Sequence, residues 1–145
     1  MAGGFALLVV FGAWSLSHTA YVFPDRDLPG HLSGRWDWSA RSRKCDDSAH
    51  VFAFSPDRRT MTIAMPRRSS ADTGWTATYD ILKLTPSRLR GAIRGEKRLT
   101  EHGLPVVWDL IMFGPDEYRW QRTDWRAWEY TAGIIRCGTR ARGAT

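Results

Sequence analysis

Long hydrophobic runs are scarce in this sequence of 145 residues. The uncharged apolar stretch Phe5–Trp14 is about half of the ~20 residues that a helix needs to cross a bilayer. A run of this length is typical of the hydrophobic region of a secretory signal peptide. Small residues that permit cleavage follow at Ser15-Leu16-Ser17 and at Ala20. We therefore expect residues 1–20 to be a signal peptide and the mature protein to be periplasmic or secreted.

The start of the chain also lacks positive charge. Residues 1–4 contain no Lys or Arg, so either the α-amino group supplies the charge that precedes a signal-peptide run or translation starts upstream of Met1. The alternative is that the apolar run is a buried strand or helix of the folded domain. The turn-rich stretch Pro24–Gly34 favours the signal peptide, because it separates the run from every later segment.

Cysteine is rare, with only Cys45 and Cys137 present. An even count in a chain with a signal peptide predicts a disulfide, which an oxidising compartment permits. Closing a loop of roughly 90 residues would stabilise the fold by ~4–5 kcal/mol on chain-entropy arguments, and measured gains are often smaller. The alternative is two separate buried thiols. The polar neighbours Arg43, Lys44 and Asp46 argue against a buried thiol at Cys45.

Lysine is also rare, and arginine takes its place. Arg supplies 18 of the 21 cationic residues, and the formal net charge is +6. Arginine suits phosphate binding, but its scatter along the chain indicates general use as the surface cation. The basic clusters fall mostly on predicted turns and do not form the single face that nucleic-acid binding needs, so we expect no nucleic-acid partner. An anionic envelope surface or an acidic protein is the partner that they allow. The clusters are Arg41/Arg43/Lys44, Arg58/Arg59, Arg67/Arg68 and Arg88/Arg90.

Motifs that carry chemistry are missing as well. The sequence has no Gly-x-Ser-x-Gly turn for a nucleophilic serine and no glycine-rich phosphate loop. The histidines of the mature chain lack the close spacing of zinc ligands. Glu96 and Asp109 could form a carboxylate pair, but Arg98 and Arg122 nearby would keep both acidic and make them poor proton donors. We therefore expect no cofactor and no metal site, and a weak enzyme on the same scaffold stays only as a third alternative to a binding or an interaction protein.

Helix signals are weak, and Asp124–Glu129 is the one segment that could form a helix. Strand signals dominate, because β-branched and aromatic residues alternate with polar ones between turn residues. Short links predict an all-β, antiparallel meander of about eight strands, which closes into a barrel or, alternatively, forms a two-sheet β-sandwich. The expected strands are 34–39, 51–54, 60–65, 75–84, 89–99, 106–113, 118–123 and 130–137.

These segments make one domain, residues 34–138, preceded by a linker at 21–33 and followed by a tail at 139–145. The position of Cys45 conflicts with a simple meander. Cys45 lies beyond the end of the first strand, whereas the last strand should end beside the start of the first. Residues 40–48 would have to carry Cys45 back, which an extended chain covering ~3.3 Å per residue can do.

Gly34-Arg35-Trp36 on the first predicted strand resembles the Gly-x-Trp motif that opens the barrel in lipocalins and related calycins. The resemblance implies a lipocalin-like barrel in which an arginine of the last strand packs across the tryptophan and seals one end. Arg136 is placed to do this against Trp36, and such a cation–π contact is worth ~0.5–2 kcal/mol. The chain is also similar to small exported bacterial proteins of unknown function that pair a cysteine before the second strand with a terminal Arg-Cys. That likeness implies no activity.

Aromatic and charged residues concentrate on the sixth and seventh predicted strands. The two-residue period places Tyr118, Trp120 and Arg122 on one face, beside the face of the neighbouring strand that carries Trp108. We expect these four residues to line a cavity that binds a small apolar, amphipathic or anionic molecule, with Arg122 orienting it. An eight-stranded barrel can instead be filled by its own side chains. In that alternative the cluster is structural, and the protein is an envelope interaction or structural module without a ligand.

Overall fold

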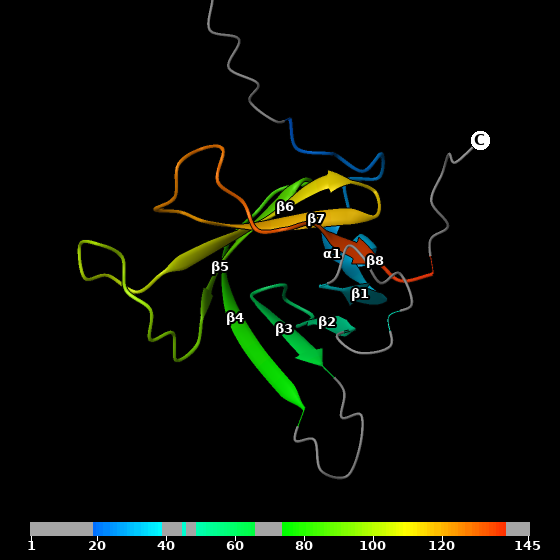
Figure 1. Ribbon diagram of the computed structural model, residues 1–145. Helices are drawn as coiled ribbons and strands as arrows, with labels where there is room; N and C mark the ends of the chain where they lie inside the picture. Colours follow the sequence, from blue (N-terminus) through cyan, green and yellow to red (C-terminus); the bar gives the residue numbers. More distant parts are fainter. Residues whose placement is uncertain (1–18, 39–44, 46–48, 66–73, 139–145) are drawn as a thin grey trace, which may run out of the picture.

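Eight antiparallel strands close into a barrel in the computed structural model, which describes residues 19–38, 45, 49–65 and 74–138 (Figure 1). Each strand pairs with the next along the chain, and β8 pairs with β1. This closure confirms the predicted meander barrel over the two-sheet sandwich. Residues 1–18 of the expected signal peptide and the expected tail lie outside the described residues. The elements are α1 (Leu28–Leu32), β1 (Arg35–Asp37), β2 (His50–Phe54), β3 (Thr60–Met65), β4 (Trp75–Leu84), β5 (Arg88–Ile93), β6 (Val107–Gly114), β7 (Glu117–Arg122) and β8 (Ile134–Arg136).

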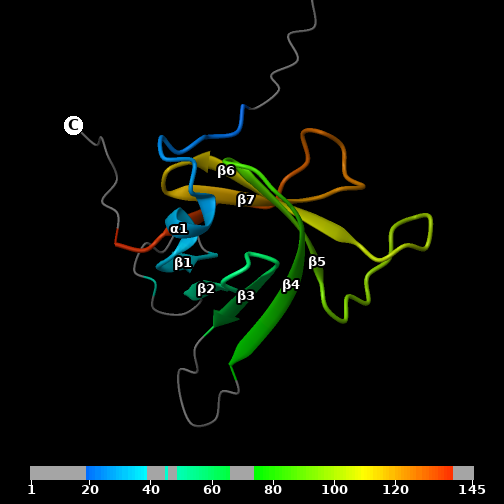
Figure 2. The same cartoon turned by 180° about the vertical axis from the view of Figure 1, so that it is seen from behind.

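The two ends of the barrel differ in their connections. At the closed end, short turns join β2 to β3, β4 to β5 and β6 to β7, and α1 lies against this end. At the open end lie the longer connections, from β1 to β2, β3 to β4, β5 to β6 and β7 to β8. Two of these, residues 94–106 and 123–133, project away from α1 in both views (Figures 1 and 2). The open end is therefore the one at which a cavity can be entered.

The fifth and eighth strands end or begin well inside the ranges that the sequence predicts. The strand expected at 89–99 ends at Ile93, because the chain turns there: the amide of Glu96 donates to the carbonyl of Ile93, and Gly95 has a φ of +75° that favours glycine. The strand expected at 130–137 begins only at Ile134. The residues released from these strands form the two projecting loops of the open end.

Residues 21–33, expected to be a linker, contain the helix α1 and close the barrel. Pro29 near its start fixes a helical φ, and Leu28 and Leu32, four residues apart, lie on one helix face and are fully buried. Phe23 is 3% exposed in the same core. The one segment that could form a helix, Asp124–Glu129, forms turns, since a helix this short is marginal on its own. No described helix is long and apolar enough to cross a membrane.

Trp36 and Arg136 seal the closed end as the resemblance implied. Trp36 is fully buried, and the guanidinium carbon of Arg136 lies 4.3 Å from the centre of its ring. Arg136 also donates to the carboxylate of Asp116 at 3.0 Å and to the carbonyl of Ser33 at 2.9 Å. The arginine thus joins β8, the turn between β6 and β7, and the chain entering β1.

Cys45 and Cys137 form the predicted disulfide, with their Cα atoms 5.8 Å apart. Arg35 holds both cysteines in place: its side chain donates to the carbonyl of Cys45, and its own carbonyl accepts from the amide of Cys137. The chain after β1 therefore returns Cys45 to the level of the start of that strand. The bond ties the connection between β1 and β2 to the end of β8.

Candidate functional site

A cavity of about 300 Å³ lies at the open end of the barrel. Its wall combines inward-facing side chains of β4 to β7 with residues beside the strand ends. Toward the closed end the interior is filled instead by side chains such as Leu110 and Met112, which are fully buried. The lining residues are Trp38, Trp75, Tyr79, Ile93, Arg98, Trp108, Trp120 and Thr131.

Stacked and edge-on rings fix the shape of this cavity. Tyr79 and Trp120 stack with their ring centres 5.3 Å apart and their planes 12° from parallel. Trp108 meets Trp120 edge-on at 6.3 Å. Gly91 on β5 makes room for Tyr79, since a Cβ at this position would lie 3.2 Å from its ring. Such aromatic pairs add ~0.5–1.5 kcal/mol beyond the area that they bury, so the rings hold their places without a ligand.

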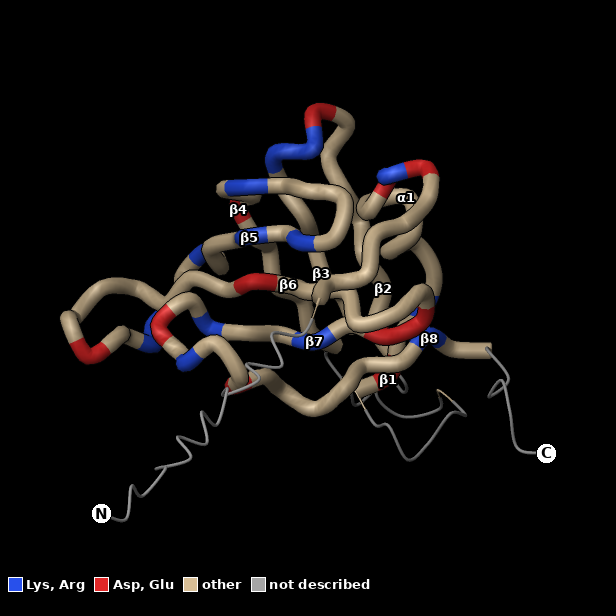
Figure 3. Tube along the Cα trace, turned by 90° about the horizontal axis from the view of Figure 1, so that it is seen from above, with Lys and Arg blue, Asp and Glu red and all other residues tan. Residues whose placement is uncertain are grey.

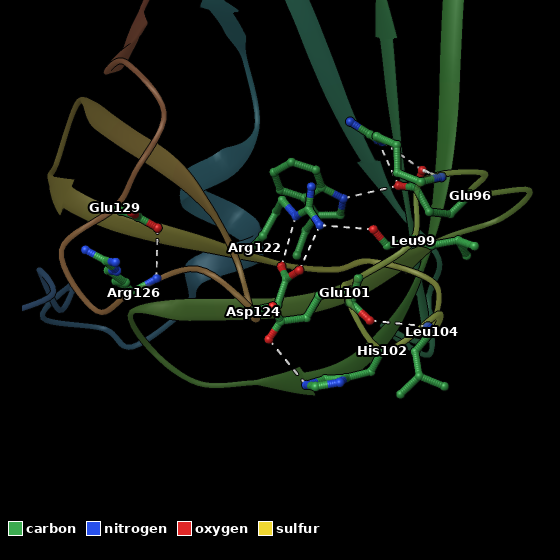
Figure 4. A network of polar contacts seen from close by, with 12 residues as sticks. Glu96, Leu99, Glu101, His102, Leu104, Arg122, Asp124, Arg126 and Glu129 are labelled. Carbon is green, nitrogen blue, oxygen red and sulfur yellow. Dashed lines mark hydrogen bonds and ion pairs between the residues drawn. The ribbon is translucent and has the colours of Figure 1, made fainter.

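One corner of the cavity is polar. The guanidinium of Arg98 donates from Nε and Nη2 to the two carboxylate oxygens of Glu96, both at 2.8 Å, and lies 4.9 Å from the ring centre of Trp108. The indole of Trp108 donates to Glu96 at 3.2 Å, as the dashed line to Glu96 in Figure 4 marks. Hydrogen bonds from Arg98 lower the pKa of Glu96 to about 2. The corner therefore holds a fixed ion pair against an aromatic wall.

The hydroxyl of Tyr79 is the second polar feature of the cavity. Tyr79 is 5% exposed, yet among the described residues no group hydrogen-bonds its hydroxyl. Burial raises the pKa of this phenol, so the hydroxyl keeps its proton at neutral pH. This hydroxyl is not among the buried polar atoms that lack a partner, so it is open to the cavity and a ligand or water can accept its hydrogen bond.

Two of the four predicted ligand-binding residues line the cavity, Trp108 and Trp120. Tyr118 does not line it: this residue is fully buried in the filled half, where its hydroxyl and Nε2 of His50 lie 2.5 Å apart. Arg122 does not line it either. Its guanidinium pairs with Asp124 at 2.8 Å and also reaches the carbonyl of Leu99 at 3.4 Å (Figure 4).

Position along the strand β7 explains why only some of the predicted residues line the cavity. Tyr118, Trp120 and Arg122 share a face, but they follow one another along the barrel from the filled core to the rim of the open end. Only Trp120 is level with the cavity. Sequence reasoning missed Tyr79, although the inward alternation of Ala77 and Tyr79 on β4 was a usable signal. Arg98 lies in a loop, and no local pattern marked it.

No family model, no curated protein and no solved structure matches this chain. The likeness to calycins consequently rests on features of this chain alone. These are the closed eight-stranded meander and the arginine packed on the first-strand tryptophan.

Other charged groups are paired away from the cavity. Asp109 lies on the outer face of β6 and is held by Arg90 of β5 through two contacts of 2.8 Å, so Arg122 is not its partner as the sequence suggested. Figure 3 shows this acidic position of β6 beside the basic positions of β5. Glu96, in contrast, has the predicted arginine partner, Arg98.

Within the described residues, no group of three or more His, Cys, Asp or Glu side chains could hold a metal ion.

The loops around the open end carry exposed apolar side chains. Leu99 is 56% exposed and Leu104 65% in the connection between β5 and β6, and Trp128 is 70% exposed between β7 and β8. Two cavity residues, Trp38 and Trp75, are also partly exposed at the rim. The entrance to the cavity is thus more apolar than an ordinary loop region.

Proposed function

We propose that this chain is an exported, lipocalin-like barrel protein that binds one small apolar or amphipathic molecule. The observation that carries the proposal is the aromatic cavity of about 300 Å³ at the open end. This volume is at the lower limit of the ~300–1,000 Å³ of ordinary ligand pockets, and its mostly apolar wall with a few polar groups is typical of them. The ligand is therefore small, on the scale of one or two rings.

The physical basis of binding is a preformed apolar site. The stack of Tyr79 on Trp120 fixes the wall before a ligand enters, so little ordering free energy opposes binding. Transfer of ligand surface from water to this wall contributes ~25 cal/mol per Å² of apolar area. Export is supported by the disulfide between Cys45 and Cys137, because such bonds persist mainly in oxidising compartments.

The second candidate function is an envelope interaction or structural module without a ligand. The observation that favours it is the exposure of Leu99, Leu104 and Trp128 on the two projecting loops. Apolar patches on loops often mark a protein or membrane contact. An acidic protein or an anionic envelope surface remains the partner that the excess of basic residues favours.

Calorimetric titration with decanoate and with 2-methylnaphthalene separates the two functions. The ligand proposal expects saturable binding of at least one of them by the wild type. Replacing Ile93 by Phe should weaken this binding at least tenfold, because the larger ring occupies the cavity. Leu82→Phe, at an exposed position near the closed end of β4, is the matched control and should bind as the wild type does. Arg122→Ala should also keep the affinity. No saturable binding in the wild type would favour the interaction module.

A further inference from the structure

The polar corner of the cavity offers hydrogen-bond donors to a ligand. Its one carboxylate, Glu96, is not free to accept a further hydrogen bond. Glu96 accepts four bonds, from the amide, Nε and Nη2 of Arg98 and from the indole of Trp108. A carboxylate has about four lone-pair sites, so its acceptor capacity is used up. The side chain of Glu96 is only 6% exposed. A ligand in the cavity therefore meets the other members of this corner, not the carboxylate.

Arg98 keeps one nitrogen available. Its Nε and Nη2 bind Glu96, whereas Nη1 has no hydrogen-bond acceptor among the described residues. The bidentate pair and the ring of Trp108 beneath the guanidinium fix its orientation. Its side chain remains 56% exposed and lines the cavity, so Nη1 can be reached by a ligand. A guanidinium nitrogen only donates hydrogen bonds.

Tyr79 supplies a second donor at a fixed position. Its ring is held between Trp120, on which it stacks, and Gly91 of the neighbouring strand. The hydroxyl has no partner among the described residues, and its raised pKa keeps it protonated. The charges of Arg98 and Glu96 act on the pKa of the Tyr79 hydroxyl in opposite directions, so the three groups lie close enough to interact electrostatically. Two preorganised donors thus face a cavity whose remaining wall is mostly aromatic.

We infer that the ligand is a planar aromatic carboxylate or a close analogue, seated with its rings against Tyr79, Trp108 and Trp120. Its carboxylate accepts hydrogen bonds from the Tyr79 hydroxyl and from Nη1 of Arg98. This inference rests on the proposed function, since it names the ligand class of the same cavity. An amine of equal size is disfavoured, because it meets the guanidinium and finds every oxygen of Glu96 already bonded. A plain hydrocarbon binds more weakly, because it covers the Tyr79 hydroxyl without offering it an acceptor.

Three naphthalenes of nearly equal shape test the inference by calorimetry: 2-naphthoate, 2-methylnaphthalene and 2-naphthylmethylammonium. The wild type should bind 2-naphthoate at least tenfold more tightly than 2-methylnaphthalene, and the ammonium compound most weakly. Tyr79→Phe should weaken 2-naphthoate about tenfold and leave 2-methylnaphthalene within about twofold, since a hydrogen bond to a charged group is lost while the ring remains. Arg98→Gln should give the same pattern. Unchanged near-UV circular dichroism shows that each variant keeps its fold.

Arg94→Gln is the matched control. Arg94 is in the same loop but is paired with Asp80 and does not line the cavity. Its replacement removes an equal charge and should leave the affinity for 2-naphthoate unchanged. An equal loss in Arg94→Gln and Arg98→Gln, or a wild type that binds 2-methylnaphthalene as tightly as 2-naphthoate, overturns the carboxylate inference while the apolar cavity stands. If the wild type binds none of the three compounds or decanoate, the proposed function itself fails.

Discussion

At the scale of single residues, charged groups of this barrel serve to fix neighbours. Arg136 lies on Trp36 and binds three segments, and Arg98 lies on Trp108 while holding Glu96. In both cases a guanidinium covers an indole and pairs with a carboxylate, one at each end of the barrel. The closed-end pair seals a packed core, whereas the open-end pair borders a cavity. The same side-chain combination therefore has a structural role at one end and a proposed binding role at the other.

Replacing Trp36 by Ala should destabilise the protein by about 3–5 kcal/mol, as large aromatic truncations in cores do. The indole is fully buried, and it donates a hydrogen bond to the carbonyl of Leu32. Urea unfolding followed by circular dichroism measures the change. Trp128→Ala, at a 70% exposed position, is the control and should change stability by no more than ~0.5 kcal/mol. A denaturant midpoint near that of the wild type for Trp36→Ala would show that this residue does not seal the fold.

Glu96 should make stability depend on acid pH. Its folded pKa of about 2 is lower than the ordinary value of 4.5, so its contribution is fully present above about pH 4.5 and is lost as the pH falls toward 2. Glu96→Gln should therefore be less stable than the wild type at pH 6 and lose less stability between pH 5 and pH 2. Urea midpoints across this range measure the slope.

Glu101→Gln is the control for this pH dependence, because Glu101 is in the same loop with 83% of its side chain exposed. It should follow the wild-type curve. Parallel curves for Glu96→Gln and the wild type would argue against the ion pair with Arg98.

At the scale of elements, the helix α1 and the long loops divide the barrel into two halves. Leu28 and Leu32 of α1 enter the core from the closed end, where the interior is solid. The strand β5 ends early at Ile93, and the loop that follows brings Arg98 over the cavity. A longer β5 would have carried these residues along the barrel wall. The early turn is thus what creates the polar corner.

Leu32→Ala should cost about 2–5 kcal/mol, because it leaves a void beneath α1 in a fully buried position. Leu82→Ala removes the same atoms from a side chain that is 58% exposed and should stay within ~0.5 kcal/mol of the wild type. Guanidinium unfolding of both variants gives the comparison. Equal effects at the two positions would contradict the role of α1 as the plug of the closed end.

At the scale of the whole molecule, closure joins the two ends of the domain. The strands β1 and β8 are only three residues long each, and they pair through few residues. The disulfide from Cys45 to Cys137, with a sequence separation of 92, reinforces the region of this short seam. The bond therefore adds a covalent link in the part of the barrel where neighbouring strands pair through only two residues each.

Reduction of the disulfide should lower the free energy of unfolding by about 2–4 kcal/mol, since a cross-link over a long loop mainly restricts the unfolded chain. Urea unfolding with and without reductant measures this. The double replacement of Cys45 and Cys137 by Ser should match the reduced wild type. Mass spectrometry of the unreduced, alkylated protein should find no alkylated cysteine, and two alkylated thiols would disprove the bond.

The sequence by itself determined the number of strands and their order, although not where β5 ends and β8 begins. Alternating side chains and turn residues such as Ser55 and Asp57, which bond each other at 2.6 Å, act within a few positions, so local patterns reveal them. The pairing of Trp36 with Arg136 followed from a motif. Tertiary structure alone decided which part of the interior stays open. Tyr118 and Trp120 share one face of one strand, yet one is in the filled core and the other borders the cavity, because α1 fills only the closed end. Arg98 reaches the cavity through a turn at Gly95. Arg122 pairs with the nearby Asp124, but its contact with the carbonyl of Leu99 joins distant segments, and such contacts carry no local signature.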